Sequence, residues 1–233
     1  GIGLAMVAAV KGYKSVFVMA ANMSEERKRI LLAYGSELIL TPAEAGTVGA
    51  IEEAKRLQKE KGYFFVGQHF NPSNPEAHQT TADEIWKDFG DKLDAVICTT
   101  GTGGSISGIG KYLQANNPDL QMIATEPADS PILSKGVAGS HKIMGTAPGF
   151  IPEILDTSIY NSIVPITTKE AYDGARFLAE KEGIFAGISS GAALAGMLKV
   201  ARRQSMKDAT LLAILPDTGE RYLSTDVWSG DGS

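Results

Sequence analysis

The 233-residue chain lacks several features that would assign it to a class at once. Its single cysteine, Cys98, excludes an intrachain disulfide framework, suits a reducing compartment and is interpreted as a buried strand residue. Lys and Arg number 22 against 27 Asp and Glu without any basic run, so we expect no nucleic-acid partner. No apolar stretch is long enough to span a bilayer. The three histidines, His69, His78 and His141, share no metal-binding spacing, so no metal is expected either.

What the chain does have is an alternation of apolar and helical segments in an ordinary globular composition. The segments rich in β-branched residues, which we expect to form strands, are 15–20, 37–40, 63–66, 93–99, 121–125, 163–166 (an edge strand) and 210–215. The helices expected between them are 24–34, 47–61, 76–89, one that ends near 115, 168–181 and 190–203. Strands separated by helices of this length indicate parallel sheets with crossover helices. We therefore expect an α/β fold of two lobes, divided into a smaller N-terminal lobe, 1–68, and a larger lobe, 69–233.

Three smaller features complete this outline. The apolar opening segment, 1–10, is expected to be a buried helix of a domain whose first part is absent. Ser24 is expected to cap the helix 24–34, with Gly35 just past its end. The small, polar tail 229–233 is expected to fray.

A glycine-rich loop carries the strongest local signal for a ligand. Residues 99–108 (TTGTGGSISG) follow the apolar strand 95–98 and lead directly into a helix. Free N–H groups at such a helix start, aided by the helix dipole and by the hydroxyls of Thr102 and Ser105, form a seat for an anion. The loop contains no lysine, unlike a nucleotide P-loop, and Ile106 replaces the third glycine of a dinucleotide fingerprint. One phosphate monoester remains the best candidate, and a glycine-rich turn without a ligand is the alternative.

Two other segments follow strands and contain polar side chains. In 214–222 the turn Pro216-Asp217-Thr218-Gly219 lies where ligands of open α/β sheets bind. In 67–75 Gln68 is a neutral donor suited to a substrate carboxylate. We interpret the three histidines as exposed or satisfied residues rather than as bases or ligands.

Taken in order, these segments resemble the fold-type II pyridoxal-phosphate enzymes, with their tryptophan synthase β-like fold, and in particular the cysteine synthases (O-acetylserine sulfhydrylases). The resemblance spans nearly the whole chain, and the combination of motifs is more specific than any one of them. The segments that carry it are MSEER at 23–27, QHFNPSNP at 68–75, GTGGS at 101–105, EP at 126–127, HKIMGTAPGFIP at 141–152, GISSGA at 187–192 and LPDTGERYLST at 215–225.

The resemblance implies pyridoxal 5′-phosphate as the cofactor and a β-replacement that makes L-cysteine from O-acetyl-L-serine and sulfide. The residues that would hold the cofactor phosphate are Gly101, Thr102, Gly103, Gly104 and Ser105. Thr218 would hydrogen-bond the pyridine nitrogen, and its hydroxyl leaves the ring a weaker electron sink than a carboxylate would, which suits β-elimination. Gln68 would bind the substrate carboxylate, and Gly145 would contact the substrate from the loop 142–149 at the mouth of the site.

The resemblance also places the family's Schiff-base lysine upstream of Gly1. We therefore assign none of the lysines present to catalysis, and we expect the isolated chain to be inactive. Met144 stands where glutamine is common in the family, which leaves the acceptor open.

Two other interpretations remain. One is a cystathionine β-synthase or a serine/threonine dehydratase-like enzyme, and the other is a catalytically incompetent fragment or binding partner that keeps the phosphate seat. The ending of the last motif at Thr225 favours a cysteine synthase. The resemblance further implies an amino-acid substrate, a homodimer, serine acetyltransferase as a partner of some members, and a cytoplasmic location.

Overall fold

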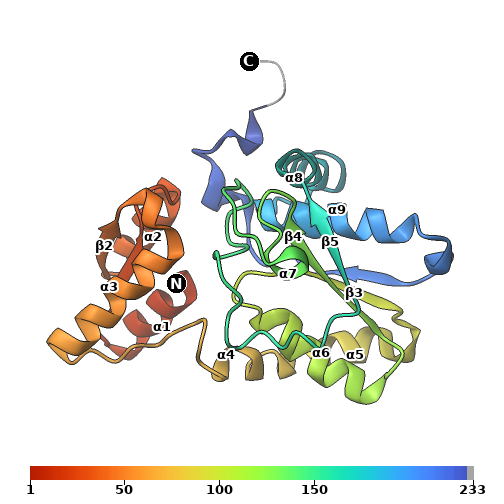
Figure 1. The fold of residues 1–233 in the computed structure, drawn as a ribbon, viewed down its shortest axis with the longest axis horizontal. Coiled ribbons are helices and arrows are strands. Elements are labelled where there is room, and N and C mark those ends of the chain that lie inside the picture. Colours follow the sequence, from red (N-terminus) through yellow and green to blue (C-terminus); the bar gives the residue numbers. More distant parts are fainter. Residues whose placement is uncertain (230–233) are drawn as a thin grey trace. The chain divides into compact units, whose positions relative to one another are not determined.

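The computed structural model describes residues 1–229, which fold into two compact units (Figure 1). One unit comprises residues 1–66 and the described part of the C-terminal segment from Glu220, and the other comprises residues 67–219. The tail expected to fray lies, apart from Ser229, outside the described residues.

The N-terminal unit contains a two-stranded parallel sheet with its helices. Its strands pair from Val16 opposite Glu37 to Ala20 opposite Thr41. The elements are α1 (Ile2–Lys11), β1 (Val16–Ala20), α2 (Glu25–Ala33), β2 (Glu37–Thr41), a 3₁₀ turn (Ala43–Ala45) and α3 (Gly46–Lys61). A parallel pair needs a crossover connection, and α2 provides it.

Two expectations for this unit are wrong. Helix α1 is not a buried helix, because Ala5 and Ala8 are its only buried residues and Val10 is 84% exposed. The segment 63–66 is not a strand, because Phe64 is 87% exposed and no described strand pairs with the segment. The apolar, β-branched composition of both segments predicted that they are buried. The burial of a segment, however, also depends on the elements that pack against it.

The ends of α2 agree only in part with the expectation. Ser24 occupies the N-cap position, but its side chain makes no capping hydrogen bond, and its Oγ is buried without a partner. Gly35 follows the helix with a φ of 78°, a left-handed conformation that glycine adopts at little cost.

The described part of the C-terminal segment, from Glu220, contacts α2 within the N-terminal unit. Tyr222 is fully buried, and the Arg27 guanidinium lies 4.7 Å from the centroid of its ring. The Glu26 carboxylate accepts hydrogen bonds from the backbone N–H and the hydroxyl of Ser224, at 2.7 and 2.8 Å. These contacts explain why the structure differs from the expected division, which gives this segment to the lobe 69–233.

The larger unit is built on a four-stranded parallel sheet in the order β5-β4-β3-β6. Its strands are β3 (Ala95–Thr99), β4 (Gln121–Pro127), β5 (Ser162–Ile166) and β6 (Leu211–Ala213). Its helices are α4 (Ser73–Glu76), α5 (Gln79–Phe89), α6 (Gly104–Asn116), α7 (Ile132–Lys135), α8 (Thr168–Glu182) and α9 (Ile188–Ala201). Short 3₁₀ turns of this unit lie at Gly90–Lys92 and Gln204–Met206, the turn Gly219–Tyr222 begins at its last residue, and the turn Asp226–Trp228 belongs to the N-terminal unit. The expected α/β class and the edge position of β5 are confirmed.

One expected helix is divided in two. Instead of a continuous helix over 76–89, α4 ends at Glu76 and α5 begins at Gln79. Between them His78 turns its ring toward α6 and hydrogen-bonds Ser105. The N-terminal piece approaches α6 closely, because a Cβ on Gly108 would lie 2.1 Å from the Pro75 carbonyl oxygen.

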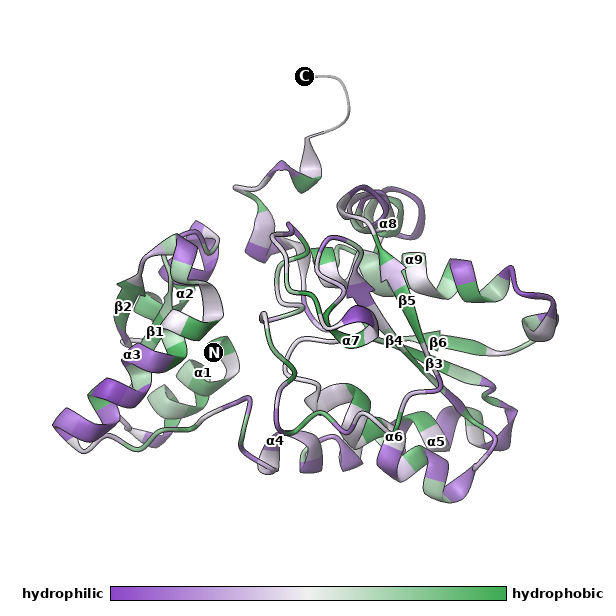
Figure 2. Ribbon diagram, in the orientation of Figure 1, coloured by the Kyte–Doolittle hydropathy of each residue, from purple (hydrophilic) through white to green (hydrophobic). Residues whose placement is uncertain are grey.

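Helices cover both faces of this sheet (Figures 1 and 2). On one face Val96 and Cys98 of β3 join a core cluster with α5 and α6, which includes Ile85 and Ile106. On the other face α9 approaches so closely that a Cβ on Gly196 would lie 2.5 Å from Thr125 Cγ2 of β4. Burial on both faces is what a parallel sheet of apolar strands predicts.

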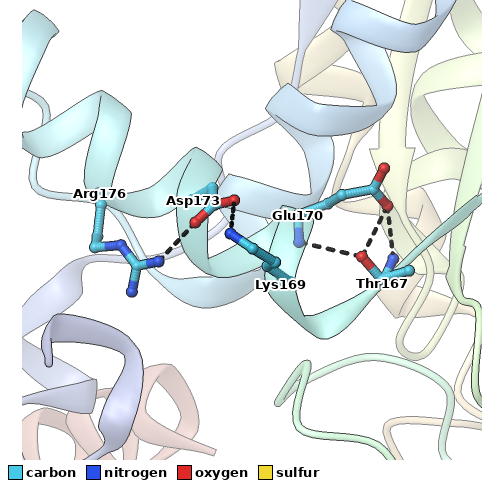
Figure 3. A network of polar contacts seen from close by, with 5 residues as sticks. All are labelled: Thr167, Lys169, Glu170, Asp173 and Arg176. Atoms are coloured by element: carbon cyan, nitrogen blue, oxygen red, sulfur yellow. Dashed lines mark hydrogen bonds and ion pairs between the residues drawn. The ribbon is translucent and has the colours of Figure 1, made fainter. Parts of the chain in front are cut away.

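Helix α8 is held in place by polar contacts at its start (Figure 3). Thr167 and Glu170 form a capping box, in which Thr167 Oγ1 accepts from the Glu170 N–H and the Glu170 carboxylate accepts from the Thr167 N–H. The same carboxylate accepts from Lys199 Nζ of α9 at 2.8 Å. Asp173 pairs with Lys169 and Arg176 on the exposed side.

Cys98 is buried in β3, as expected, and burial raises the pKa of its thiol to about 12. Within the described residues, no group of His, Cys, Asp or Glu side chains has the arrangement of a metal site. None of the described helices is both long enough and apolar enough to cross a membrane.

Candidate functional site

The candidate site lies at the carboxyl end of β3, next to β6. Helix α6 leaves β3 toward β4 on one face of the sheet, whereas α8 and α9 precede β6 on the other face (Figure 1). The strand order therefore reverses between β3 and β6. In open α/β sheets, ligands bind at such a switch point, outside the carboxyl ends of the strands.

The loop between β3 and α6 is shaped by close approaches that only glycine allows. A Cβ on Gly101 would lie 2.3 Å from the Gly145 carbonyl oxygen. Gly103 has a φ of 83°, and its Cβ would lie 2.6 Å from Leu155 Cβ. On Gly104, which begins α6, a Cβ would lie 2.0 Å from Asn74 Oδ1. The loop is thus packed from outside by side chains and backbone, which leaves the first N–H groups of α6 as donors for an anion.

Two hydroxyls flank this helix start, and each has a defined partner. Thr102 Oγ1 accepts from the Gly104 N–H at 3.3 Å and from Asn74 Nδ2 at 3.1 Å. Ser105 Oγ lies 3.1 Å from His78 Nε2, and His78 Nδ1 lies 3.3 Å from Thr81 Oγ1. Burial lowers the pKa of His78, which favours the neutral form of its ring.

The expected carboxylate-binding segment lies beside this loop. Gly67 has a φ of 60°, and Gln68 after it is exposed. Asn74 Nδ2 donates to the Gln68 carbonyl oxygen at 2.8 Å, and the same amide reaches Thr102. The segment 68–75 and the glycine-rich loop are therefore brought together, as the hypothesis of one shared site requires.

The loop 142–149 is attached to the carboxyl end of β3 by its backbone. The Ala147 N–H donates to the Thr100 carbonyl oxygen at 2.9 Å, and Gly145 presses against Gly101 as described above. Within the loop Thr146 Oγ1 donates to the Ile143 carbonyl oxygen. Ala147 has a φ of 41°, an uncommon conformation for a residue with a side chain, which the surrounding contacts maintain.

Thr218 follows β6 in a turn held by backbone hydrogen bonds. The Gly187 N–H donates to the Asp217 carbonyl oxygen, and the Gly219 N–H donates to the Phe185 carbonyl oxygen, both at 3.0 Å. These bonds fix Thr218 opposite Ala186 in an isolated bridge, with the Thr218 side chain exposed. Since β3 and β6 are adjacent and parallel, Thr218 and the loop after β3 lie at the same edge of the sheet.

The histidines were interpreted as exposed or satisfied. His78 and His141 each hydrogen-bond through Nε2, to Ser105 and to the Ala147 carbonyl oxygen. His69 is buried, with its ring 5.3 Å from that of Phe150, and His141 Nδ1 is buried without a partner, so the interpretation is borne out only in part. The sequence did not single out Asn74 or His78 as site residues. The sequence offered only two signals for them, which are the turn Asn-Pro-Ser-Asn-Pro that contains Asn74 and the position of His78 ten residues after Gln68. Neither signal indicates the direction of a side chain.

The residues present fit a pyridoxal phosphate group. The fit rests on the glycine-lined loop, which a single Cβ at Gly101, Gly103 or Gly104 would disrupt, and on the helix N-terminus with two hydroxyls. No lysine or arginine lies in the loop itself, which matches a monoester bound by backbone and hydroxyl donors.

Comparisons with known proteins agree with this geometry. A family described as "Pyridoxal-phosphate dependent enzyme" matches residues 1–217. Cysteine synthase of Staphylococcus aureus (strain Mu50 / ATCC 700699) is 48% identical over 99% of this chain and 75% of its own length. The structure of cysteine synthase from Entamoeba histolytica matches with a TM-score of 0.92 and 40% identity, over 98% of this chain and 68% of that one. The O-acetylserine dependent cystathionine beta-synthase of Helicobacter pylori matches with a TM-score of 0.91 and 34% identity, over 97% and 74%.

Proposed function

We propose, for a chain that belongs to the family of pyridoxal-phosphate dependent enzymes, the β-replacement that makes L-cysteine from O-acetyl-L-serine and sulfide. The single observation that carries the proposal is the glycine-lined helix start at the switch point between β3 and β6, with Thr218 at the same edge of the sheet. The 48% identity to a cysteine synthase over nearly the whole chain supports the choice of reaction.

The roles of the chain's own residues follow from their positions. Backbone N–H groups at Gly103 and Ser105, with the hydroxyls of Thr102 and Ser105, would hold the cofactor phosphate, and Gly104, whose N–H donates to Thr102 Oγ1, would line the seat. The Thr218 hydroxyl would hydrogen-bond the ring nitrogen and leave it largely unprotonated. The cofactor, when bound, supplies the electron sink for loss of the acetate.

Substrate recognition is proposed for two segments beside the seat. The exposed Gln68 amide would donate to the substrate carboxylate without adding charge. Gly145, with a φ of 88° and its carbonyl against Gly101, would contact the substrate from the mouth loop. An amino-acid substrate bound between them would have its carboxylate and its reacting carbons over the carboxyl end of β3.

The activity test compares two substrate pairs with the natural protein that carries these residues. Cysteine formation from O-acetylserine and sulfide should exceed cystathionine formation from serine and homocysteine. Preference for the second pair would replace the assignment with a cystathionine β-synthase, the second candidate, which the similarity to the Helicobacter pylori protein favours. In the same assay Gln68→Glu should raise KM for O-acetylserine about 10- to 100-fold, because two carboxylates then face each other. The matched change Gln58→Glu, on the exposed surface of α3, should leave KM unchanged.

The 233-residue polypeptide by itself serves as a second test. None of its lysines is assigned to the covalent link with the cofactor, so borohydride treatment in the presence of pyridoxal phosphate should give no adduct at one specific lysine. A single, stoichiometric site would contradict that assignment. We also propose a cytoplasmic homodimer and serine acetyltransferase as a partner. A single cysteine suits a reducing compartment, and the resemblance to the cysteine synthases is the basis for both associations. Light scattering of the purified protein, alone and mixed with the acetyltransferase, tests both associations.

A further inference from the structure

The side chain of Asn74 connects two parts of the candidate site. It lies in the turn that begins α4, and its Nδ2 donates to the Gln68 carbonyl oxygen at 2.8 Å and to Thr102 Oγ1 at 3.1 Å. Its Oδ1 lies against the backbone of Gly104, where a Cβ would come within 2.0 Å. One amide therefore touches the proposed carboxylate-binding segment, the phosphate-binding hydroxyl and the first residue of α6.

The orientation of this amide is fixed by its partners. The carbonyl oxygen of Gln68 can only accept a hydrogen bond, so the NH₂ group of Asn74 must face it. With one N–H on Gln68, the second N–H is the one that points to Thr102. Both donors of the amide are used.

This arrangement determines the direction of the Thr102 hydroxyl. A hydroxyl has two acceptor lone pairs and one O–H donor. Thr102 Oγ1 accepts from Asn74 Nδ2 and from the Gly104 N–H, so both lone pairs are occupied by protein donors. The only hydrogen-bonding capacity left is the O–H, which is free to donate to an anion at the start of α6.

We propose that Asn74 is a positioning residue that holds Thr102 as a hydrogen-bond donor to the cofactor phosphate and keeps the Gln68 segment in register with it. The inference rests on the proposed function, since it concerns the same phosphate seat. Asn74 itself does not touch the phosphate. It acts through Thr102, and this indirect action gives the inference a test of its own.

The test is a double-mutant cycle on phosphate binding rather than on activity. The ligand is pyridoxine 5′-phosphate, which has no aldehyde and so forms no link with lysine, and inorganic phosphate is a second probe. Calorimetric dissociation constants are measured for the 233-residue chain, Asn74→Ala, Thr102→Val and the double variant. We expect each single change to weaken binding about 10-fold, the scale of one hydrogen bond to a charged group. The double variant should match Thr102→Val within about 2-fold, because Asn74 has no separate route to the phosphate.

A conservative variant gives the larger effect. Asn74→Asp keeps the size of the side chain but presents an acceptor to Thr102, so the hydroxyl turns inward and a negative charge lies near the phosphate. We expect binding to weaken about 100-fold. The matched control is Asn116→Asp, an exposed asparagine at the end of α6, which should leave the dissociation constant unchanged. Urea midpoints of all variants show whether they are folded.

The outcomes separate the two proposals. Suppose that the native chain binds pyridoxine 5′-phosphate and that Asn74→Ala weakens binding equally in the native and the Thr102→Val backgrounds. Asn74 then acts by packing, and the inference is overturned, whereas the proposed phosphate site is supported. If Asn74→Asp binds as tightly as the native chain, the inference also fails. If the native chain binds neither probe, the phosphate seat itself is wrong, and the proposed function falls together with the role of Asn74.

Discussion

The two units of the molecule show the same alternation of strands and helices, but their strand residues are buried to different degrees. In the larger unit four of the five residues of β3 are buried, as are six of the seven of β4. In the N-terminal unit β1 and β2 each have a single buried residue. Sheet order explains the contrast, because β3 and β4 are central strands with helices on both faces, whereas a two-stranded sheet has no centre. The glycine-rich loop and its partners all belong to the unit with the buried sheet, which suits a site that needs fixed geometry.

The largest expected difference between the units comes from adding one methyl group to a helical glycine. In Gly191→Ala, on α9, the new Cβ would lie 2.0 Å from the Ala171 carbonyl oxygen and 2.4 Å from the Ala175 nitrogen. Backbone atoms cannot move aside easily, so we expect a loss of about 3 kcal/mol or more in the free energy of unfolding. Gly3→Ala, on α1, meets nothing within 4 Å and should instead gain up to about 1 kcal/mol from helix propensity. Urea unfolding followed by circular dichroism measures both, and equal effects would contradict the difference in packing.

Thiol labelling tests whether the N-terminal unit opens more readily than the larger one. Cys98 is buried in β3 and its pKa is raised to about 12, so it reacts only when that sheet opens. A second chain with Cys98→Ala and Ala20→Cys moves the thiol to a buried position of β1. We expect the thiol in β1 to react about 100-fold faster at equal pH, which corresponds to about 3 kcal/mol less protection. Identical rates for the two thiols would mean that both units open together.

Helix capping gives a smaller contrast between the same two units. Thr167→Ala removes the capping box of α8 and should cost about 1 kcal/mol. Ser24→Ala removes a hydroxyl that makes no capping bond and is buried without a partner, so it should be neutral or slightly stabilising. Thermal unfolding of the two variants beside the native chain is the measurement. A loss from Ser24→Ala as large as that from Thr167→Ala would show that Ser24 does cap α2.

The smallest effect concerns acid stability. Partial burial raises the pKa of Glu170, but hydrogen bonds from Lys199 and Thr167 lower it by more, so the net pKa lies below the ordinary value. A depressed folded-state pKa contributes stability above the unfolded-state value of about 4.3, and the contribution is lost as the pH falls through the folded-state pKa. Because both side chains are about one third exposed, solvent screening limits the contribution to well under about 1 kcal/mol. The free energy of unfolding of Glu170→Gln should therefore fall slightly less between pH 5 and pH 3 than that of the native chain. A steeper fall in the variant would contradict the direction of the pKa shift.

The class of fold and the order of its strands and helices were predictable because the periodicity of the chain reports local structure. The shape of the glycine-rich loop was predictable for a related reason, since glycine spacing after a strand restricts what the backbone can do, and its role as a phosphate seat remains a prediction. The continuous helix over 76–89, the strand 63–66 and the burial of α1 failed because each depends on neighbours distant in sequence. Asn74 and His78 were missed for the same reason, because a side chain's direction is set by tertiary contacts. The roles of Gln68, Gly145 and Thr218 remain predictions that the binding and activity tests address.

The attachment of the loop 142–149 to the seat uses main-chain atoms on both sides. The Ala147 N–H meets the Thr100 carbonyl, and the Gly145 carbonyl meets the Cα of Gly101. These two contacts involve no side chain of the loop, whereas Ile143 and Thr146 are buried within it. A change of side chain at position 144 that altered the proposed acceptor preference would therefore leave these two backbone contacts in place.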